Sequence, residues 1–510
     1  MARAVEVGLV AALAALISRL AWRSLPWPLL HDAPIMHYIA WRISEGAAPY
    51  RDLFDMNFPG VYLFHLAVVR ILGTGDAAWR AVDLAVTSVT MLLVFALAAP
   101  WGRVAALGGA LFFAGYHLAG GAWSTGQRDL LICPLLLGGA LGVVRWAERG
   151  LLRLLLGAGA GLGVALTIKP QAIVFVAALV VFVAMHGRRI TAPAITPPAV
   201  LLGGALIAPA AVIAWVASFG ALAAWREIVF GYLLPLYSRV SNTADWKWLR
   251  WKMWIAVGLT LLFTLVRLAR TRRFTTRHLV VTLGLAYGFV HFIAQRKGWE
   301  YHLYPFAAFT AVLLFSEVRA ALATRPRLVA PGLALGLVAT VWILSMDGQR
   351  AVASAEMDSG WVRLKERRVG ALAADLAMRV RGGDLVQVLD TSDSGIHALL
   401  RQRLVEPTRF LYDFHFFHHV GTPMIERLRS ELIDGLVNRR PAYIVVARWD
   451  WLQAGYERAD LYDASAADVG PQPDDQPFRA FPALQDLLAR SYRLDRQGDG
   501  YRIYAKRDGS

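Results

Sequence analysis

Basic residues stand in a place where membrane proteins ordinarily avoid them. The segment QRKGWEYH, residues 295–302, joins two apolar runs and contains Arg296, Lys297 and His302. The alternation of apolar runs puts this loop on the outer side of a membrane, where short loops carry few positive charges. Such an exception predicts an anionic partner such as a phosphate, which arginine and lysine bind through charge-assisted hydrogen bonds. The alternative is a routine contact with lipid headgroups.

Two further cations lie at the ends of apolar runs. Lys169 occupies a turn so tight that the flanking apolar runs leave little room for water. A lysine buried there requires an anion, although a side chain that snorkels to the interface is the competing explanation. Arg128 and Asp129 begin another apolar run. They form either part of a site or an ordinary helix start, with Asp129 near the positive end of the helix dipole.

The loop after the first apolar run contains a third group of polar side chains. His31 and Asp32 directly follow that run, and Tyr38, Asp52 and Asp55 come soon after. An ionisable residue at the end of a span is a functional candidate because it is costly to hold near lipid. The ordinary interpretation is that these residues cap the ends of short helices, since Asp32 stands in a suitable N-cap position before Pro34.

Three histidines, His415, His418 and His419, alternate with aromatic residues in the sequence DFHFFHH. Imidazoles are common zinc ligands, but no second cluster with recognisable ligand spacing accompanies them. Cys133 is the only cysteine, so one chain can form neither a disulfide nor a thiolate metal site. We therefore expect this segment to be a loop that dips back toward the membrane.

The composition indicates an integral membrane protein. Of 510 residues, 57% are hydrophobic and 18% charged, a balance that disfavours a soluble domain with a charged surface. The net charge of +16 comes mostly from arginines in short loops between apolar runs. That is the pattern of a membrane topology signal, so membrane lipids are expected as partners and a nucleic acid is not.

The fold class expected is a polytopic α-helical membrane protein. About eleven apolar runs are long enough to cross roughly 30 Å of hydrocarbon. They lie near residues 5–28, 81–99, 103–121, 129–145, 151–168, 170–187, 197–217, 251–268, 278–295, 302–319 and 327–346. With the N-terminus in the cytoplasm, every inner connection is basic, as the positive-inside rule requires. The inner arginines are Arg103, Arg145, Arg149, Arg153, Arg188, Arg189, Arg267, Arg270, Arg272, Arg273, Arg277, Arg319, Arg325 and Arg327.

The outer loop at residues 29–80 is expected to be structured. Residues 61–72 are apolar but too short to span a membrane, and residues 34–45 have a helical period. Both predict interfacial helices. The loop at residues 218–250 has the aromatic content of a membrane-interface belt, in Trp225, Tyr232, Tyr237, Trp246 and Trp248.

The composition changes at about residue 350, which divides the chain into a transmembrane part, residues 1–348, and a soluble α/β domain, residues 349–510, on the non-cytoplasmic side. Strands are expected at 385–389, 443–447 and 501–505, helices at 362–380, 422–438 and 482–491, and a mobile loop at 464–478.

Four segments together resemble the GT-C superfamily of membrane glycosyltransferases, in particular bacterial members akin to protein O-mannosyltransferases and the lipid A aminoarabinose transferase. They are HDAPIMHYIAWRISEGAAPYRDLFDMNFPG in the first outer loop, QRD at 127–129, KPQ at 169–171 and QRKGWEYH at 295–302. The resemblance covers the membrane part and the general plan of the outer domain. It implies an enzyme that moves a sugar, with inversion, from a polyprenyl phosphate to an acceptor hydroxyl at the outer face.

By this resemblance Asp32 matches the acidic residue that serves as the general base. Many relatives carry a second acid directly beside the first, whereas this chain has His31 before Asp32 and Ala33 after it. The departure argues against a paired-acid role and favours a mechanism without a metal or other cofactor. The alternative is a divalent metal held by Asp32, Asp129 and a histidine.

The other candidates are divided between the donor and the acceptor. Positive charge for the departing phosphate is expected from Arg128, Lys169, Arg296, Lys297 and His302. Contact with the acceptor, or support for Asp32, is expected from His31, Tyr38, Asp52, Asp55 and Asp129.

The sequence leaves the acceptor open between a glycan, a lipid and a protein, and its Ala-, Arg- and Gly-rich composition indicates a bacterial inner membrane. Two other function classes compete with the enzyme. A flippase for lipid-linked glycans should place charges near mid-membrane or in two related halves, whereas these candidate charges gather at one face. A non-catalytic scaffold would tolerate removal of Asp32.

Overall fold

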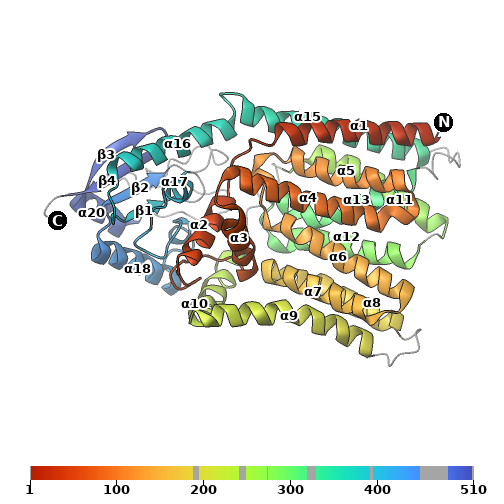
Figure 1. The fold of residues 1–510 in the computed structure, drawn as a ribbon, viewed down its shortest axis with the longest axis horizontal. Coiled ribbons are helices and arrows are strands. Elements are labelled where there is room, and N and C mark those ends of the chain that lie inside the picture. Colours follow the sequence, from red (N-terminus) through yellow and green to blue (C-terminus); the bar gives the residue numbers. More distant parts are fainter. Residues whose placement is uncertain are drawn as a thin grey trace.

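A helical bundle and a smaller unit with a β-sheet make up the chain in the computed structural model (Figure 1). The structure describes residues 2–187, 195–240, 249–272, 274–318, 329–390, 394–447 and 481–507. Several residues singled out in the sequence lie outside the described residues, namely Arg188, Arg189, Trp246, Trp248, Arg273, Arg319, Arg325, Arg327 and the loop at 464–478. The N-terminus lies at the free end of the bundle, and the C-terminal residues lie at the opposite end of the molecule.

Each apolar run found in the sequence overlaps a described helix of the bundle. These helices are α1 (Ala2–Arg23), α4 (Asp76–Ala98), α5 (Arg103–Ala119), α6 (Arg128–Arg149), α7 (Leu152–Ile168), α8 (Ile173–Gly187), α9 (Thr196–Ser218), α11 (Trp251–Arg270), α12 (Thr276–Gln295), α13 (Tyr304–Leu314) and α15 (Val329–Glu356). Within the described residues, 7 helical segments are long and apolar enough to cross a membrane. The prediction of a polytopic α-helical membrane protein is confirmed at that level. The helix α13 has only 11 residues, which is shorter than the range expected there.

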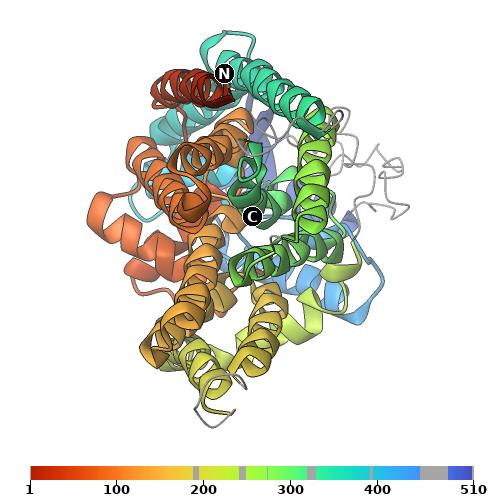
Figure 2. The same ribbon diagram turned by 90° about the vertical axis from the view of Figure 1, so that its right-hand side faces the viewer.

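Small residues let neighbouring helices of the bundle approach closely. A Cβ atom added at Gly159 in α7 would lie 2.2 Å from the Leu201 carbonyl oxygen of α9, and one at Gly204 in α9 would lie 2.5 Å from the Leu156 carbonyl oxygen. Helices pack this closely in membranes because van der Waals contact replaces the hydrophobic effect as the driving force. Viewed along the bundle, α7, α8 and α9 form one edge, and α1 and α15 form the opposite edge (Figure 2).

Short helices lie between the bundle and the sheet. The first outer loop contains α2 (Ala33–Ser44) and α3 (Pro59–Leu72), so both helices expected in this loop are present. After α9 the chain forms α10 (Leu222–Arg226) and the π-helix η4 (Glu227–Leu233). Both lie at the same end of the bundle as α2 and α3 (Figure 1).

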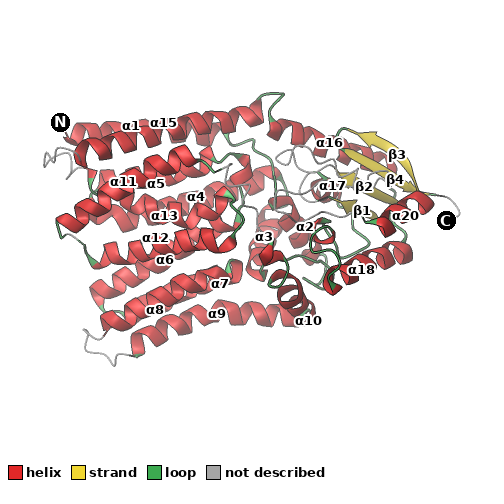
Figure 3. Cartoon of the chain, turned by 180° about the vertical axis from the view of Figure 1, so that it is seen from behind, coloured by secondary structure: helices red, strands yellow, loops and turns green. Residues whose placement is uncertain are grey.

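The sheet has the strand order β1-β2-β4-β3. The strand β1 (Val386–Leu389) pairs in parallel with β2 (Tyr443–Ala447), and β2 pairs antiparallel with β4 (Tyr501–Lys506). The hairpin partner of β4 is β3 (Tyr492–Gly498). The α-helices described in this unit are α16 (Trp361–Arg379), α17 (Gly395–Gln402), α18 (Pro423–Arg439) and α20 (Pro482–Ser491) (Figure 3).

Among the described strands and α-helices of this unit, β3 and α17 were not expected from the sequence. The strand β3 has polar, exposed residues along most of its length, so it lacks the apolar alternation that marks a half-buried strand. The helix α17 has 8 residues and is too short for a helical period to stand out.

Arginines at the free end of the bundle form hydrogen bonds and ion pairs between helices. The Arg277 guanidinium donates to Glu148 Oε1 at 2.6 Å and to the Leu97 carbonyl at the end of α4 at 3.0 Å. Arg267 Nε donates to Glu317 Oε2 at 2.8 Å, with both side chains largely buried. These arginines therefore also join the ends of neighbouring helices.

Candidate active site

Asp32 forms an ion pair with Arg128, between the start of α2 and the start of α6. Asp32 occupies the N-cap position of α2, but its side chain makes no capping hydrogen bond. Instead Asp32 Oδ2 accepts a hydrogen bond of 2.6 Å from Arg128 Nη2, at the first residue of α6. The ordinary interpretation of Asp32 as a helix cap is thus wrong for its carboxylate. The carboxylate instead pairs with a cation that comes from another helix.

The charge around Asp32 is predominantly positive. Burial raises the pKa of Asp32, but His31 and Arg128 outweigh it, with smaller contributions from Lys169 and His302, and the pKa lies below its ordinary value. His31 Nε2 lies 3.6 Å from Asp32 Oδ1, and the imidazole stacks on Trp123 with 3.6 Å between ring centroids. Asp32 is therefore an ionised carboxylate facing several potential donors.

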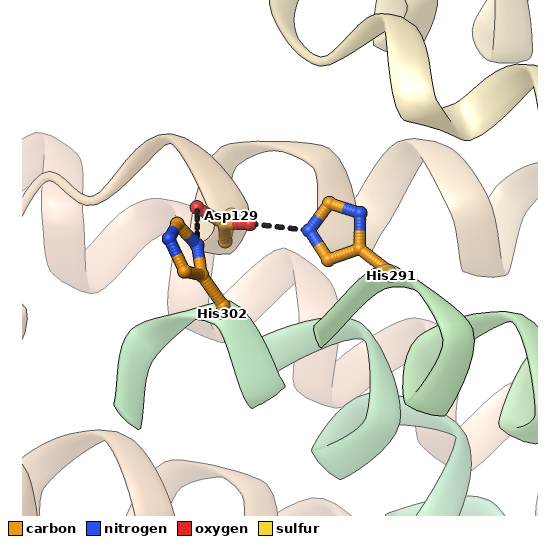
Figure 4. Close-up of side chains that lie close together, drawn as sticks. All are labelled: Asp129, His291 and His302. Carbon is orange, nitrogen blue, oxygen red and sulfur yellow. Dashed lines mark hydrogen bonds and ion pairs between the residues drawn. The ribbon is translucent and has the colours of Figure 1, made fainter. Parts of the chain in front are cut away.

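Asp129, which is itself fully buried, is the centre of a second cluster. Its Oδ1 lies 2.6 Å from His291 Nε2, and its Oδ2 lies 3.2 Å from His302 Nδ1 (Figure 4). Lys169 Nζ lies 2.9 Å from the same Oδ2 and donates to Gln295 Oε1 at 3.1 Å. The lysine in the tight turn thus has the anion that its burial requires, and that anion is a carboxylate of the same protein.

Asp129, His291 and His302 could together hold a metal ion, because one ligand atom from each lies within 4.8 Å of the others. Asp32 is not in this group, so the alternative set of Asp32, Asp129 and a histidine is not the one that the geometry assembles. The Lys169 ammonium already contacts the Asp129 carboxylate. A divalent ion there would have to displace or repel that ammonium.

Several buried polar atoms beside these two clusters have no hydrogen-bond partner. They are Gln127 Oε1, Arg128 Nε, Gln171 Oε1, the Tyr301 hydroxyl and His302 Nε2. Buried polar groups are normally satisfied, so such a group calls for an explanation. These atoms belong to Arg128 and His302 or to residues within two positions of Arg128, Lys169 and His302. Their concentration there indicates a site built for a polar ligand.

The first outer loop supports Arg128 from the other side. Arg128 Nη1 donates to the Asn57 side-chain oxygen, and Asn57 Nδ2 donates to Asp55 Oδ2 at 2.8 Å. Asp55 is buried and also accepts hydrogen bonds from the hydroxyl groups of Tyr62, at 2.5 Å, and Tyr412, at 2.6 Å. Asp55 therefore supports Arg128 indirectly and joins the bundle to the sheet unit.

A buried carboxylate fixes the loop that precedes Arg128. Asp83 Oδ1 accepts from the Gly126 backbone nitrogen at 2.9 Å, and Asp83 Oδ2 contacts His117 Nε2 at 2.9 Å and the Arg80 guanidinium. Gly126 has φ +70, and a Cβ added there would lie 2.3 Å from the Trp79 ring. Only glycine fits this combination of backbone conformation and space.

Lys169 is positioned by a similar close contact. It lies between α7 and the short helix η3 (Pro170–Ala172), and its backbone nitrogen donates to the Ala165 carbonyl at 2.8 Å. The start of α3 packs on the end of α7, where a Cβ added at Gly60 would lie 2.2 Å from Thr167 Oγ1. The first outer loop therefore helps to set the place of the lysine.

The structure brings His31, Asp32, Arg128, Asp129, Lys169 and His302 together and places the other candidates elsewhere. The Tyr38 hydroxyl donates to the Leu404 carbonyl at 3.0 Å, and Asp52 pairs with Arg51 and caps the Ala48 backbone nitrogen. Both therefore support the outer loop.

The two cations next to each other in QRKGWEYH also lie apart from Asp32. Arg296 is exposed and has φ +56 at the end of α12. Lys297 is buried, lies 4.1 Å from the Tyr237 ring centroid and donates to the carbonyls of Tyr237, at 2.9 Å, and Val240. The Lys297 side chain therefore orders the neighbouring loop, and His302 is the residue of this segment that reaches the cluster.

The three histidines of DFHFFHH contact the segment around η4. The Tyr232 hydroxyl lies 2.8 Å from His415 Nδ1 and 3.0 Å from His418 Nε2, and His419 Nε2 lies 3.0 Å from the Leu236 carbonyl. The loop contacts Tyr232 in η4 and Leu236 just after it, while its expected approach to the membrane stays a prediction. Its imidazoles serve to attach the sheet unit there.

Sequence reasoning missed Asp83, Asn57, His291 and Gln295. His291 and Gln295 lie 4 residues apart on α12 and so share a helix face. That spacing, directly before the basic loop, was the available signal. The sequence contained no such signal for Asp83 and Asn57, because each contacts a residue that is distant in the sequence.

Comparison with known proteins agrees with this architecture. The chain matches the structure of ArnT from Cupriavidus metallidurans bound to undecaprenyl phosphate, with a TM-score of 0.58, 12% identity and 98% of each chain covered. Its apo state matches with a TM-score of 0.53 at 11% identity, again over 98% of each chain. The chain has the GT-C fold.

Two further comparisons extend this result. The Archaeoglobus fulgidus oligosaccharyltransferase, tethered to an acceptor peptide that contains the NVT sequon, matches with a TM-score of 0.51 and 13% identity, over 99% of this chain and 74% of that one. Residues 58–215 match the family model described as dolichyl-phosphate-mannose-protein mannosyltransferase. No curated protein sequence matches the chain. The predicted resemblance to the GT-C superfamily is confirmed.

Proposed function

We propose that this GT-C protein is an inverting glycosyltransferase that moves a sugar from a polyprenyl phosphate to an acceptor hydroxyl, with Asp32 as the general base. The observation that carries the proposal is the ion pair of Asp32 with Arg128, surrounded by buried polar atoms that lack partners. The undecaprenyl phosphate bound to ArnT supports a polyprenyl-phosphate donor.

The donor phosphate is bound by Arg128, Lys169 and His302. Arg128 offers Nε, which has no partner in the structure, and His302 offers Nε2, which also has none. Lys169 adds a positive charge that is already held in the site by Asp129. Arg296 and Lys297 are not assigned this role, because Arg296 is exposed and the Lys297 ammonium is engaged by backbone carbonyls.

In the reaction the acceptor hydroxyl forms a bond to the anomeric carbon and gives its proton to Asp32, while the bond from that carbon to the phosphate oxygen breaks. The cations stabilise the charge that develops on the departing phosphate. Arg128 links the two events. When it shares its charge with the donor phosphate, it neutralises Asp32 less, so the pKa of Asp32 rises and the carboxylate becomes a better base.

The proposed mechanism uses no metal ion. The Lys169 ammonium beside Asp129 supplies the kind of positive charge that a divalent ion would bring to a phosphate. Asp129 in turn orients His302 through Nδ1 and leaves Nε2 for the donor. Asp129 and His31 thus act as supports of the cationic side chains and of Asp32.

We further propose that all the predicted apolar runs cross a bacterial inner membrane, with α5, α7, α8 and α13 as the shorter helices. The N-terminus then lies in the cytoplasm, and the soluble unit of residues 349–510 lies in the periplasm. This placement is supported by the basic connections on one side and by the gathering of the outer loops and the sheet at the other end of the bundle (Figure 1).

The test compares the wild type with Asp32→Asn, supplied with an undecaprenyl-phosphate sugar and membrane extract as the acceptor. Release of undecaprenyl phosphate is measured with and without a chelator, and donor binding is measured separately. Asp486→Asn is the control, because the Asp486 side chain on α20 is 69% exposed and pairs with Arg490, not with Arg128.

We expect Asp32→Asn to bind donor and to lose turnover, the control to keep turnover, and the wild type to resist the chelator. Normal turnover in Asp32→Asn would remove the base assignment. Loss of turnover on chelation would favour a metal at Asp129, His291 and His302.

A further inference from the structure

A separate cavity lies between the first outer loop and the sheet unit. It has a volume of about 710 Å³ and is lined from one side by the end of α2 and the residues that follow it, and from the other by residues 405–410 and α18. This volume is within the range of about 300–1,000 Å³ that is typical of small-molecule sites. Its lining includes neither Asp32 nor Asp129.

The walls of this cavity combine cations and carboxylates. Arginine and acidic side chains both line it, among them Arg42, Glu45, Arg409, Glu431, Asp434 and Arg439. Arg409 and Glu431 form a two-point ion pair of 2.6 and 2.7 Å beside the Phe410 ring. In the described part of the chain, Arg42, Glu45 and Arg439 take part in no ion pair, and Arg42 lies over the Trp41 ring, 5.8 Å from its centroid. These side chains therefore keep hydrogen-bonding capacity for a ligand.

A buried carboxyl group in the lining has an unused oxygen. Glu406 is 7% exposed, and its Oε1 accepts hydrogen bonds from Gln387 Nε2 at 3.1 Å and the Val388 backbone nitrogen at 3.2 Å. Its Oε2 has no partner. Burial raises the pKa of Glu406 well above its ordinary value, so this group holds its proton to higher pH and offers an O–H donor.

We propose that this cavity binds a neutral, polyhydroxylated saccharide. Each sugar hydroxyl both donates and accepts, and a wall of balanced arginines and carboxylates satisfies both capacities. An anionic ligand would instead favour an excess of cations, and an apolar ligand would not repay the desolvation of these groups.

The place of the cavity suggests how it serves the enzyme. Phe54 N donates to the Arg409 carbonyl at 2.6 Å, and the next residue, Asp55, holds Asn57 against Arg128. A saccharide in the cavity therefore contacts the same loop that supports the ion pair of Asp32. We assign it to a glycan part of the acceptor, distant from the reacting hydroxyl, a role that rests on the proposed function.

The test uses the full chain in a detergent without a sugar headgroup, because a glycoside detergent would compete. The purified protein is applied to an array of neutral and acidic oligosaccharides, and the best neutral ligand is then titrated by fluorescence. The variants are Arg42→Ala with Arg439→Ala, and Glu406→Met. The control is Arg490→Ala, which removes an arginine 81% exposed on α20 and outside the cavity.

We expect a neutral oligosaccharide to bind and its affinity to fall about tenfold or more in the double arginine variant, as lost hydrogen bonds to charged groups predict. The control should bind like the wild type. Glu406→Met should also bind more weakly, whereas Glu406→Gln, which keeps a donor and an acceptor, should not.

No neutral ligand on the array, a preference for acidic sugars, or equal binding by the double arginine variant would overturn the proposal. Asp32→Asn should bind the oligosaccharide normally. Saccharide binding in the cavity is then independent of the general base, so a failure of the glycosyl-transfer assay and a failure of saccharide binding can be distinguished.

Discussion

Asp32 Oδ2 and Arg128 Nη2 lie 2.6 Å apart, although their residues are 96 positions apart in the sequence. The contact joins the start of α2 in the first outer loop to the start of α6 in the bundle. One cation thus touches the proposed base and, through Nε, remains available to a ligand. The ion pair therefore couples the protonation of Asp32 to the occupancy of the phosphate site.

Removing Arg128 should change both the rate and its pH dependence. In Arg128→Ala, burial raises the pKa of Asp32 with less opposition, so the acid limb of kcat/KM should move to higher pH. At neutral pH, kcat/KM should fall by about 10- to 100-fold, because a hydrogen bond to a charged phosphate is lost. The measurement is a pH profile of polyprenyl-phosphate release. An acid limb in the same place as that of the wild type would contradict the coupling.

The ion pair of Asp32 and Arg128 should stabilise the folded protein, and this contribution should be lost at low pH. The pKa of Asp32 lies below its ordinary value of 3.8 in the folded protein, so ionisation of Asp32 stabilises the fold above the unfolded pKa. This stabilisation is lost as pH falls through the lower, folded value. Arg490→Ala is the control, since Arg490 is exposed on α20, pairs with Asp486 and should leave the pH profiles of polyprenyl-phosphate release and of thermal unfolding unchanged.

Much of the bundle could be predicted because the bilayer imposes one rule on every span. Length and apolarity locate the helices, and the short helices α2 and α3 follow from runs that are too short to cross. The strands β1, β2 and β4 were also predictable, because each has the apolar pattern of a buried or half-buried strand.

The site was only partly predictable, because its contacts are made between helices. Asp129 and His291 are 162 positions apart, and nothing local in either segment indicates that they meet. Arg296 and Lys297 gave the stronger sequence signal, since they break the charge rule for outer loops. Their neighbour His302 reaches the cluster instead, because Arg296 ends α12 with its side chain exposed and the Lys297 side chain turns to backbone carbonyls.

The buried pair of Asp129 and Lys169 should show strong coupling in stability. Asp129→Asn leaves the Lys169 ammonium buried without its counter-ion, which should lower the free energy of unfolding by about 3–5 kcal/mol. Adding Lys169→Met should recover part of that loss, because the unpaired charge is then gone. The measurement is a double-mutant cycle from thermal unfolding in detergent. Additive losses would mean that the pair does not interact.

Tyr412 should hold the sheet unit against the bundle. Its hydroxyl donates to Asp55 Oδ1 at 2.6 Å, and both side chains are buried. Tyr412→Phe removes one donor and leaves a buried carboxylate under-satisfied, which should cost about 1–3 kcal/mol. Limited proteolysis should then cut the first outer loop faster than in the wild type. Tyr504→Phe is the control, because Tyr504 lies on β4 and takes no part in this contact. Equal cleavage of both variants would show that the Tyr412 hydroxyl does not hold the sheet unit against the bundle.

Gly126 should be sensitive to the addition of a single methyl group. It has φ +70, and a Cβ there would overlap the Trp79 ring at 2.3 Å, so Gly126→Ala must move the loop that leads into Arg128. Strain of this kind costs about 1–3 kcal/mol, and displacement of Arg128 should lower kcat/KM for donor by at least about tenfold. Gly75→Ala is the matched control, because nothing lies within 4 Å of its added Cβ and its φ is −75. Donor kinetics and thermal unfolding are measured on both variants. If Gly126→Ala loses stability but keeps the kcat/KM of the wild type, the loop does not position Arg128, and the orientation of the guanidinium must come from Asn57 and Asp32 alone.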